Sequence, residues 1–338
     1  MKAMLLRKVA PIQSSPLELS ELPLPEPGPG QLRIKVRACA ICRTDLHVIE
    51  GDLPAKKLPI IPGHQIVGTV DAIGPPASQT APENWQPGQR AGVAWLRYTC
   101  GQCVFCRAGQ ENLCEQAEFT GYHADGGYAQ YALVPAQFAY PIPDCFSDIE
   151  AAPLLCAGII GYRALERARV PAGGKLALYG FGSSAHVVIQ IALARDCQVY
   201  VVSRAEPHQQ LARQMGAAWV GASAAEMPAA VDSAIIFAPA GELVPAALER
   251  LRKGGTLALA GIYMSQWPPL DYQRHVFFER DIRSVTCNTR EDGRALLAEA
   301  ARIGIRPHVT AFPLAEANRA LQDLKADRIA GTGVLVVE

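Results

Sequence analysis

Short apolar segments alternate with amphipathic segments through the second half of the chain, and this alternation limits the folds that the chain can adopt. The segments Lys175–Tyr179 (KLALY) and Gln198–Val202 (QVYVV) are compact and apolar, as buried strands are. Further strands are expected at Ser233–Phe237 and Thr256–Ala260, with helices at Ser184–Ala194, His208–Gly216 and Leu243–Leu251. Strands that alternate with helices form a parallel sheet covered by helices on both faces. We therefore predict an α/β domain with a doubly wound parallel sheet.

Residues 1–150 have a different character, because they are rich in Pro and Gly and contain short β-branched runs. Polar and apolar residues alternate in Gln31–Ala38 and Gln65–Ile73, as they do in half-buried strands. The other elements expected outside the parallel sheet are a strand at Gly127–Val134, helices at Glu150–Glu166, Gly293–Ile303 and Glu316–Lys325, and an end strand at Gly333–Val337. A length of 338 residues suits two domains. The first is predicted to be an irregular β domain.

Composition and charge exclude several classes of function. Lys and Arg together number 32, as do Asp and Glu, so the formal net charge is zero. Such a chain has no general electrostatic attraction for nucleic acid or for an anionic membrane. The N-terminal residues lack the apolar core of a signal peptide, and no segment approaches the roughly 18 apolar residues that span a bilayer. We expect a cytoplasmic protein that acts on a small molecule.

Four of the ten cysteines lie close together, in the segment CGQCVFCRAGQENLC. They are Cys100, Cys103, Cys106 and Cys114. In a reducing compartment, clustered cysteines bind metal more often than they form disulfides. Four thiolates at these intervals can surround a tetrahedral zinc ion and leave no open position, which is typical of a structural site. An iron–sulfur cluster also takes four cysteines, so the spacing alone leaves both metals open.

A glycine-rich turn follows the strand KLALY and leads into a helix. Its residues are Gly180, Phe181, Gly182, Ser183, Ser184 and Ala185, which match the pattern G-x-G-x-x-G/A of dinucleotide-binding folds. The first Gly allows the tight turn, the second lets the backbone approach a pyrophosphate, and the helix N-terminus offers free N–H groups to the phosphates. Strand–helix turns of this kind also occur for structural reasons alone, but the βαβ context favours cofactor binding.

The end of the next strand indicates which nicotinamide cofactor is bound. An acidic residue about 20 residues after the turn would bind the ribose diol of NAD and repel the 2′-phosphate of NADP. This chain has neutral Ser203 followed by cationic Arg204. The pair suits the phosphate, and we therefore favour NADP(H) over NAD(H). The alternative is that Arg204 is simply a solvated surface residue.

The remaining Cys and His residues include three candidates for a second metal site: Cys42 in CAICRTDLH, His64 in PGHQIVG and Cys156 in PLLCAG. A catalytic zinc has three protein ligands and an open fourth position. Because these residues lie far apart in the sequence, their spacing alone is weak support, and each could be a packed core residue.

The order of the motifs resembles that of the zinc-dependent alcohol dehydrogenases of the medium-chain dehydrogenase/reductase superfamily, over nearly the whole chain. The motifs are C-R-T-D-x-H, G-H-x-x-x-G, the four-cysteine segment, a helix start that contains Cys, and the glycine-rich turn. The resemblance implies that Cys42, His64 and Cys156 hold a catalytic zinc ion. It also implies that the four-cysteine cluster holds a structural one, and so two zinc ions per chain.

The same resemblance assigns roles to the neighbours of these ligands. Asp45 would accept a hydrogen bond from the ligand His64, as second-shell carboxylates do. Thr44 would pass on the proton of the alcohol, and His47 would receive it through the cofactor ribose and release it to solvent. Arg43 and Arg290 match residues that contact the cofactor pyrophosphate. The family has Glu directly after the ligand His, whereas this chain has Gln65.

By family position, Leu53, Trp95 and Tyr122 would line the substrate channel beside Thr44 and Cys156. Trp95 would form a broad apolar wall, and Leu53 stands where some enzymes for small alcohols have Trp, although both could be ordinary core residues. These stretches contain no cationic group that suggests a charged substrate. We expect a medium-chain aliphatic or aromatic alcohol or aldehyde.

The resemblance also implies a discontinuous architecture. A GroES-like catalytic domain would comprise residues 1–152 and 288–338 with a zinc lobe at 97–115, and a Rossmann domain would comprise residues 153–287. The family forms homodimers or homotetramers. The predicted activity is that of an NAD(P)-dependent zinc alcohol dehydrogenase or aldehyde reductase. Two alternatives stay open: a zinc-free quinone or enone reductase of the same fold, and a non-catalytic relative that binds zinc and nucleotide.

Overall fold

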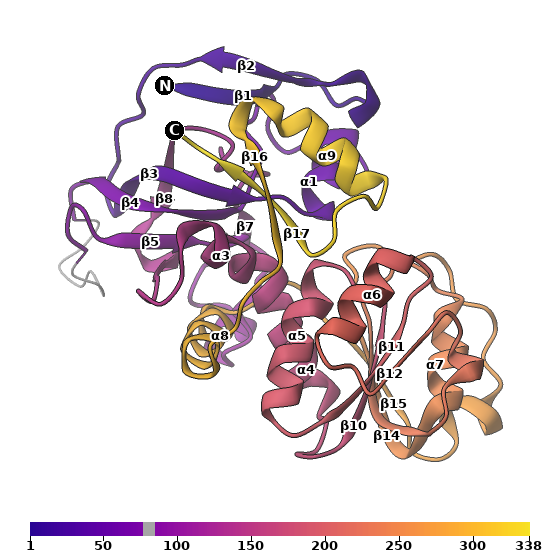
Figure 1. The fold of residues 1–338 in the computed structure, drawn as a ribbon. Coiled ribbons are helices and arrows are strands. Elements are labelled where there is room, and N and C mark those ends of the chain that lie inside the picture. Colours follow the sequence, from indigo (N-terminus) through magenta and orange to yellow (C-terminus); the bar gives the residue numbers. More distant parts are fainter. Residues whose placement is uncertain (77–84) are drawn as a thin grey trace. The chain divides into compact units, whose positions relative to one another are not determined.

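The computed structural model describes residues 1–76 and 85–338 (Figure 1), and these residues pack into two compact units. The first unit comprises Met1–Cys156, Cys287–Arg302 and Pro307–Glu338, and the second comprises Ala157–Thr286 and Ile303–Arg306. Each unit has its own sheet and its own buried apolar core. Within the described ranges, no helix is both long enough and apolar enough to cross a membrane.

The second unit is built on a six-stranded sheet in which every pair of neighbouring strands is parallel. In spatial order the strands are β12 Trp219–Gly221, β11 Gln198–Val202, β10 Lys175–Tyr179, β13 Val231–Ile236, β14 Leu251–Leu259 and β15 Asp281–Ser284. Numbered along the chain, this order is 3-2-1-4-5-6, the order of a dinucleotide-binding Rossmann sheet. The predicted doubly wound parallel sheet is confirmed.

Helices cover both faces of this sheet. They are α4 Ile159–Ala168, α5 Ser183–Ala194, α6 Glu206–Gln214 and α7 Leu243–Arg250, with short turns η5 Ala224–Glu226 and η6 Tyr272–Val276. Figure 1 shows α4 and α5 on one face and α7 on the other. Leu248 of α7 is fully buried and belongs to the same apolar core cluster as Tyr179 and Ile236 of the sheet. Burial of this apolar area from both sides explains why the strands read as continuous apolar runs.

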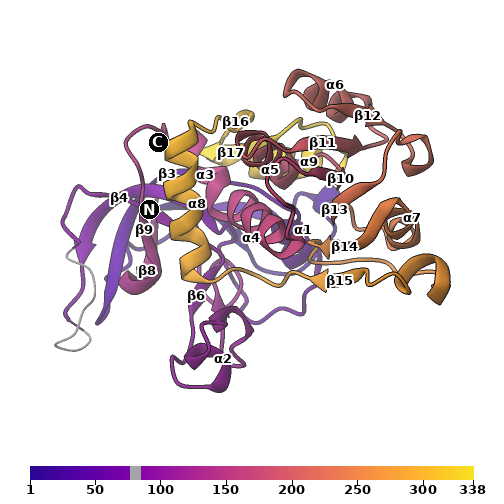
Figure 2. The ribbon, with the colours of Figure 1, turned by 90° about the horizontal axis from the view of Figure 1, so that it is seen from below.

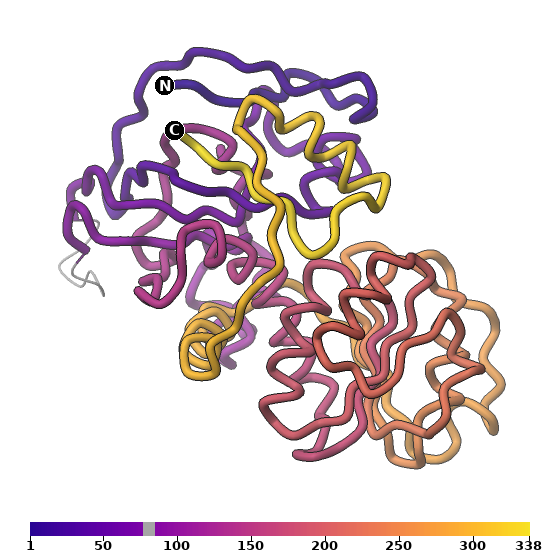
Figure 3. Tube along the Cα trace, viewed as in Figure 1, coloured from indigo at the N-terminus to yellow at the C-terminus, as the bar shows by residue number. Residues whose placement is uncertain are grey.

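The first unit contains a seven-stranded, mostly antiparallel sheet. Its strands are β16 Val309–Pro313, β17 Thr332–Val336, β3 Gln31–Ala40, β4 Gln65–Ile73, β5 Arg90–Val93 and β9 Ala139–Pro141, with β8 Tyr131–Pro135 paired to β3. Alternate residues of β3 are buried, as the sequence pattern predicts. The tube in Figure 3 shows the C-terminal strand beside an N-terminal one, where Leu335 pairs with Cys39. The C-terminal strands β16 and β17 therefore extend the sheet that strands of residues 31–141 form.

Smaller elements surround this sheet. Two further pairs of strands are β1 Lys2–Leu6 with β2 Leu17–Glu21 and β6 Leu96–Tyr98 with β7 Glu118–Phe119. The helices are α1 Arg43–Glu50, α2 Val104–Arg107, α3 Asp148–Pro153, α8 Arg290–Ile303 and α9 Ala317–Lys325, with turns η1 Ile12–Ser14, η2 Glu111–Leu113, η3 Ala136–Phe138 and η7 Leu314–Glu316. Figure 2 shows α2 at the tip of a lobe that extends away from the sheet.

Two expected elements differ from the structure for physical reasons. The helix expected at Glu150–Glu166 is three segments, because a π-turn, η4 Leu154–Gly158, separates α3 from α4. Pro153 lies at the end of α3, and a proline has no N–H with which to continue the hydrogen-bond ladder. The strand expected at Gly127–Val134 begins only at Tyr131. The backbone N–H groups of Gly127 and Tyr128 instead donate to Gly63 and Pro62.

Candidate active site and metal centres

The turn that begins α1 positions the first metal-binding candidate. Cys42 is the N-cap of α1, and its sulfur accepts a hydrogen bond from the backbone N–H of Thr44 at 3.3 Å. Asp45 completes the capping box, because its Oδ2 accepts the backbone N–H of Cys42 at 2.8 Å. The sulfur of Cys42 is therefore fixed at a helix N-terminus, where the backbone dipoles stabilise a thiolate.

His64 lies immediately before β4 and is fully buried. Its Nδ1 lies 3.0 Å from Oδ1 of Asp45, and its Nε2 lies 3.3 Å from the sulfur of Cys42. Asp45 therefore orients the ring so that Nε2 faces the sulfur. The preceding Gly63 has a φ of +96°, and a Cβ there would lie 2.3 Å from the ring of Tyr128. Only glycine allows this approach of the chain to the site.

Cys156 completes the group from the π-turn η4. The ligand atoms of Cys42, His64 and Cys156 lie within 4.8 Å of one another. Two sulfurs and one imidazole nitrogen, with a carboxylate behind the imidazole, form the donor set of a catalytic zinc site with one open position. The residues present thus fit a zinc ion.

The protonation of this group also fits a cation site. Burial lowers the pKa of His64, but the charges of Asp45 and Cys42 raise it more, to about 10. A hydrogen bond from Cys156 and the charge of His64 keep the pKa of Cys42 well below its ordinary value despite burial. A proton on His64 therefore balances the thiolate in the metal-free protein, and a zinc ion would displace that proton.

The second group of donors consists of the four sulfurs of Cys100, Cys103, Cys106 and Cys114, which also lie within 4.8 Å of one another. The backbone N–H of Cys103 donates to the sulfur of Cys100 at 3.3 Å. Backbone hydrogen bonds from Gln102 and Cys103 lower the pKa of Cys100 to about 6. Four converging sulfurs, one of them already favoured as a thiolate, fit a structural zinc ion. This lobe carries α2 (Figure 2).

The glycine-rich turn lies between β10 and α5. Gly180 has a φ of +87°, and its N–H donates to Val202 of the neighbouring strand at 2.8 Å. Gly182 is the N-cap of α5 and makes no side-chain capping bond. Ser183 and Ser184 form the first turn of the helix, and Ala185 is fully buried. The positive end of the α5 dipole therefore lies at this turn, and no side chain at Gly182 obstructs the approach of an anion.

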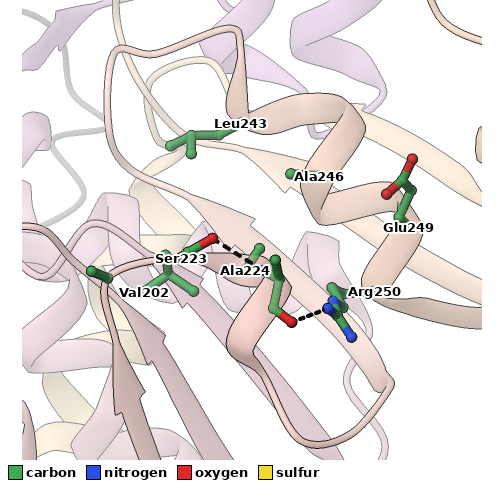
Figure 4. A pocket seen from close by; sticks show the side chains of 9 residues that line it. Val202, Ser223, Ala224, Leu243, Ala246, Glu249 and Arg250 are labelled. Atoms are coloured by element: carbon green, nitrogen blue, oxygen red, sulfur yellow. Dashed lines mark hydrogen bonds between the residues drawn. The ribbon is translucent and has the colours of Figure 1, made fainter.

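A cavity of about 460 Å³ lies in the second unit, at the carboxyl ends of β11 and β12. Val202 ends β11, and Ala222 and Ser223 follow β12. Figure 4 shows Leu243, Ala246, Glu249 and Arg250 of α7 on the opposite wall. Ligands of open α/β sheets bind outside the carboxyl ends of the strands, and this cavity has the position and size for the adenosine part of a dinucleotide.

The residues predicted to bind cofactor phosphates have different surroundings. Ser203 is buried, whereas Arg204 is exposed and its side chain makes no hydrogen bond or ion pair with the described part of the chain. Arg43 is exposed and pairs with Asp327 at 2.5 Å. Arg290 pairs with Glu111 in the zinc lobe through several bonds, the shortest at 2.7 Å.

An aromatic group stands beside the catalytic donors. Trp95 lies 4.8 Å from the ring of His64, edge to face, and stacks on Phe119 and Tyr122 at 5.0 and 5.8 Å between ring centroids. The hydroxyl of Tyr122 donates to Pro54 at 2.7 Å, next to the half-buried Leu53. Two of the predicted pocket residues, Trp95 and Tyr122, therefore lie together next to a metal-binding candidate.

Several residues at the site were not predicted from the sequence. Phe119 is recognisable only from the stacking, and Asp52 only from its contact with Nδ1 of His47 at 2.8 Å. Glu111 and Asp327 face arginines that lie 179 and 284 residues away along the chain. No spacing rule connects positions so far apart.

Comparison with known proteins agrees with this geometry. Two family models match the chain: "Alcohol dehydrogenase GroES-like domain" over residues 28–144 and "Zinc-binding dehydrogenase" over residues 185–302. The chain belongs to the zinc-containing alcohol dehydrogenases of the medium-chain dehydrogenase/reductase superfamily.

Individual relatives cover almost the whole chain. It is 50% identical to the "Probable alcohol dehydrogenase AdhA" of Mycobacterium tuberculosis, over 100% of this chain and 97% of that protein. It is 33% identical to an alcohol dehydrogenase of Geobacillus stearothermophilus, over 96% and 97% of the two chains. A cobalt- and zinc-bound thermostable alcohol dehydrogenase from Pyrobaculum aerophilum shares 26% identity and a TM-score of 0.88, with 99% of each chain covered.

Proposed function

We propose that the chain uses NADP(H) and two zinc ions to interconvert primary alcohols and aldehydes of medium-chain aliphatic or aromatic type. The observation that carries the proposal is the convergence of Cys42, His64 and Cys156 within 4.8 Å, with Asp45 behind His64. A donor set with three protein ligands is typical of catalytic rather than structural zinc. The separate four-cysteine group fits the structural ion.

The residues around the catalytic donors have different roles in the proposed reaction. Zinc held by Cys42, His64 and Cys156 would act as a Lewis acid on the oxygen of the substrate. Thr44, buried at the first turn of α1, would accept the hydroxyl proton of the alcohol as it passes its own proton through the cofactor ribose to His47. His47 lies one turn further along α1, with Asp52 fixing its ring through Nδ1 at 2.8 Å, and it passes the proton to solvent. Trp95 excludes water beside His64.

The cofactor would bind with its adenosine in the cavity beside α7 and its pyrophosphate at the N-terminus of α5. The resemblance to the family gives Arg43 and Arg290 as further phosphate contacts. Arg204 supports NADP(H), because its guanidinium is exposed and unpaired among the described residues. The test is the ratio of kcat/KM for NADPH to that for NADH in the native chain and in Arg204→Gln. Arg213→Gln is the control, since Arg213 already bonds Gln209 and Glu206. A native preference for NADH, or equal effects of both substitutions, would remove the argument.

The substrate proposal is tested with a panel of alcohols read by nicotinamide absorbance, together with zinc analysis of the same protein. Turnover of aliphatic and aromatic primary alcohols by protein that contains two zinc ions supports the proposal. Reduction of quinones or enones by zinc-free protein supports the same-fold alternative. Bound zinc and nucleotide without turnover support the non-catalytic one.

We propose two functional domains, a catalytic domain of residues 1–152 and 288–338 and a cofactor domain of residues 153–287. We also propose that the chain forms a homodimer or homotetramer. The supporting observation is that several large apolar side chains are exposed in residues 262–278, the segment that leads from β14 to the edge strand β15. These side chains are Ile262, Tyr263, Trp267, Tyr272, Phe277 and Phe278. An apolar surface next to an unpaired strand edge is typical of a protein–protein contact. Light scattering of the purified protein distinguishes monomer, dimer and tetramer.

A further inference from the structure

Arg43, the residue directly after the metal-binding candidate Cys42, is held by a carboxylate from the other end of the chain. Nη2 of Arg43 donates to Oδ1 of Asp327 at 2.5 Å. Both side chains are largely exposed, at 45% for Arg43 and 58% for Asp327. An exposed ion pair of this kind contributes about 0–1 kcal/mol, so a phosphate that approaches Arg43 can displace the carboxylate.

The backbone fixes Asp327 in this position. It follows α9 with a φ of +53°, and its N–H donates to Leu324 at 3.2 Å. The neighbouring Arg328 does not neutralise it, because the guanidinium of Arg328 bonds Asp323 instead. The carboxylate of Asp327 therefore stays near Arg43 even when a phosphate has displaced it from the guanidinium.

We propose that Asp327 sets the affinity for the cofactor by competing with its phosphates for Arg43. This inference rests on the proposed function, in which Arg43 contacts the cofactor pyrophosphate. When the cofactor leaves, the carboxylate of Asp327 binds the guanidinium of Arg43 in place of the phosphate. While the cofactor is bound, the nearby carboxylate repels the phosphates. Both effects weaken binding and speed dissociation.

Removal of this charge is expected to tighten cofactor binding. At separations of several ångströms near a surface, one negative charge changes the binding of an anion by about fivefold. We expect the Kd for NADPH to fall by about fivefold in Asp327→Asn, mainly through slower dissociation. We also expect the difference to shrink at high salt, because exposed charges are screened. Asp327→Gly is a second variant that suits the positive φ and removes the same charge.

The experiment is a fluorescence titration of the zinc-loaded protein with NADPH, with stopped-flow measurement of dissociation. The variants are Asp327→Asn, Asp327→Gly, Arg43→Gln and the double variant of Asp327→Asn with Arg43→Gln. Glu18→Gln is the matched control, because Glu18 is a carboxylate of the same unit that is as exposed as Asp327, at 58%, and bonds Arg7 rather than Arg43. The proposal predicts tighter binding in Asp327→Asn, no comparable change in Glu18→Gln, and loss of the effect in the Arg43→Gln background.

Three results would overturn it. If Asp327→Asn binds NADPH as the native chain does while Arg43→Gln binds more weakly, Asp327 does not compete, although the role of Arg43 stands. Equal tightening in Glu18→Gln would show only a general effect of charge. If Arg43→Gln leaves the Kd unchanged, the proposed contact of Arg43 with the cofactor is wrong and the inference fails with it.

Discussion

Substitution of Asp45 by Asn is expected to weaken the catalytic zinc site without touching a ligand. Asp45 is 2% exposed, and its two oxygens serve different groups. Oδ1 lies 3.0 Å from Nδ1 of His64, and Oδ2 accepts the backbone N–H of Cys42 at 2.8 Å. An Asn side chain has one acceptor oxygen where the carboxylate has two, so one of these bonds is lost. The charge that orients the imidazole is lost in either case.

The size of the effect follows from these contacts. Loss of a hydrogen-bonded carboxylate behind a ligating His typically reduces metal affinity by about 10- to 100-fold. That corresponds to about 1.4–2.7 kcal/mol. The sulfurs of the four-cysteine group accept hydrogen bonds from backbone N–H groups of their own segment and do not depend on Asp45, so the zinc ion of this group should be retained. The expected result is selective loss of one zinc ion of two.

The assay is competition for zinc with a coloured chelator, followed by metal analysis of the protein. Asp292→Asn is the matched control, because Asp292 caps α8 through Thr289 in the same way, with bonds of 2.7 Å. Asp45→Asn should release its first zinc ion at about 10- to 100-fold lower chelator concentration than either the native chain or the control. Equal zinc retention in all three proteins would refute the role of Asp45.

Three other changes have defined outcomes. Gly63→Ala should lower the free energy of unfolding, measured in urea, by about 3 kcal/mol or more, because the φ of +96° and the ring of Tyr128 both oppose a Cβ. A loss of less than about 1 kcal/mol would contradict the close packing of Gly63 against Tyr128. Glu111→Gln should cost about 2 kcal/mol at pH 7. Burial raises the pKa of Glu111, but hydrogen bonds from Arg290 lower it more. The stabilisation by Glu111 is therefore fully present above the unfolded pKa of about 4.3 and should disappear as the pH falls through the lower folded pKa. If the native chain and Glu111→Gln differ in urea unfolding by the same amount at acidic pH as at pH 7, the prediction is wrong. Gln65→Glu should retain both zinc ions but change kcat, because it adds a negative charge next to His64; unchanged rates and zinc content would show that the position does not matter.

The sequence predicts the second unit well because each of its elements has a distinct pattern. Strands β10 and β11 match the expected segments at both ends, since the four residues after the first one in each strand form a continuous buried run without charge. The glycine-rich turn lies between β10 and α5 as expected, because its residues satisfy local backbone requirements.

The first unit is harder to predict because its pairings are long-range. Strands β1 and β2 have no clear pattern of their own, and β17 forms its antiparallel pairs with β3 from the far end of the chain. The same limit applies to the site. Spacing identifies the four-cysteine group, whereas the convergence of Cys42, His64 and Cys156 follows from the resemblance and from the fold. Pairs such as Arg43 with Asp327 need the three-dimensional structure.

The most direct test of the two-zinc interpretation is metal analysis combined with turnover in the native chain and in Cys42→Ser. Cys42 supplies one of three ligand atoms within 4.8 Å, and it belongs to only one of the two groups. The prediction is two zinc ions per native chain with alcohol-dependent NADPH formation, and one zinc ion with loss of that activity in Cys42→Ser. A native chain without zinc, or a Cys42→Ser protein that keeps both zinc and turnover, would contradict it.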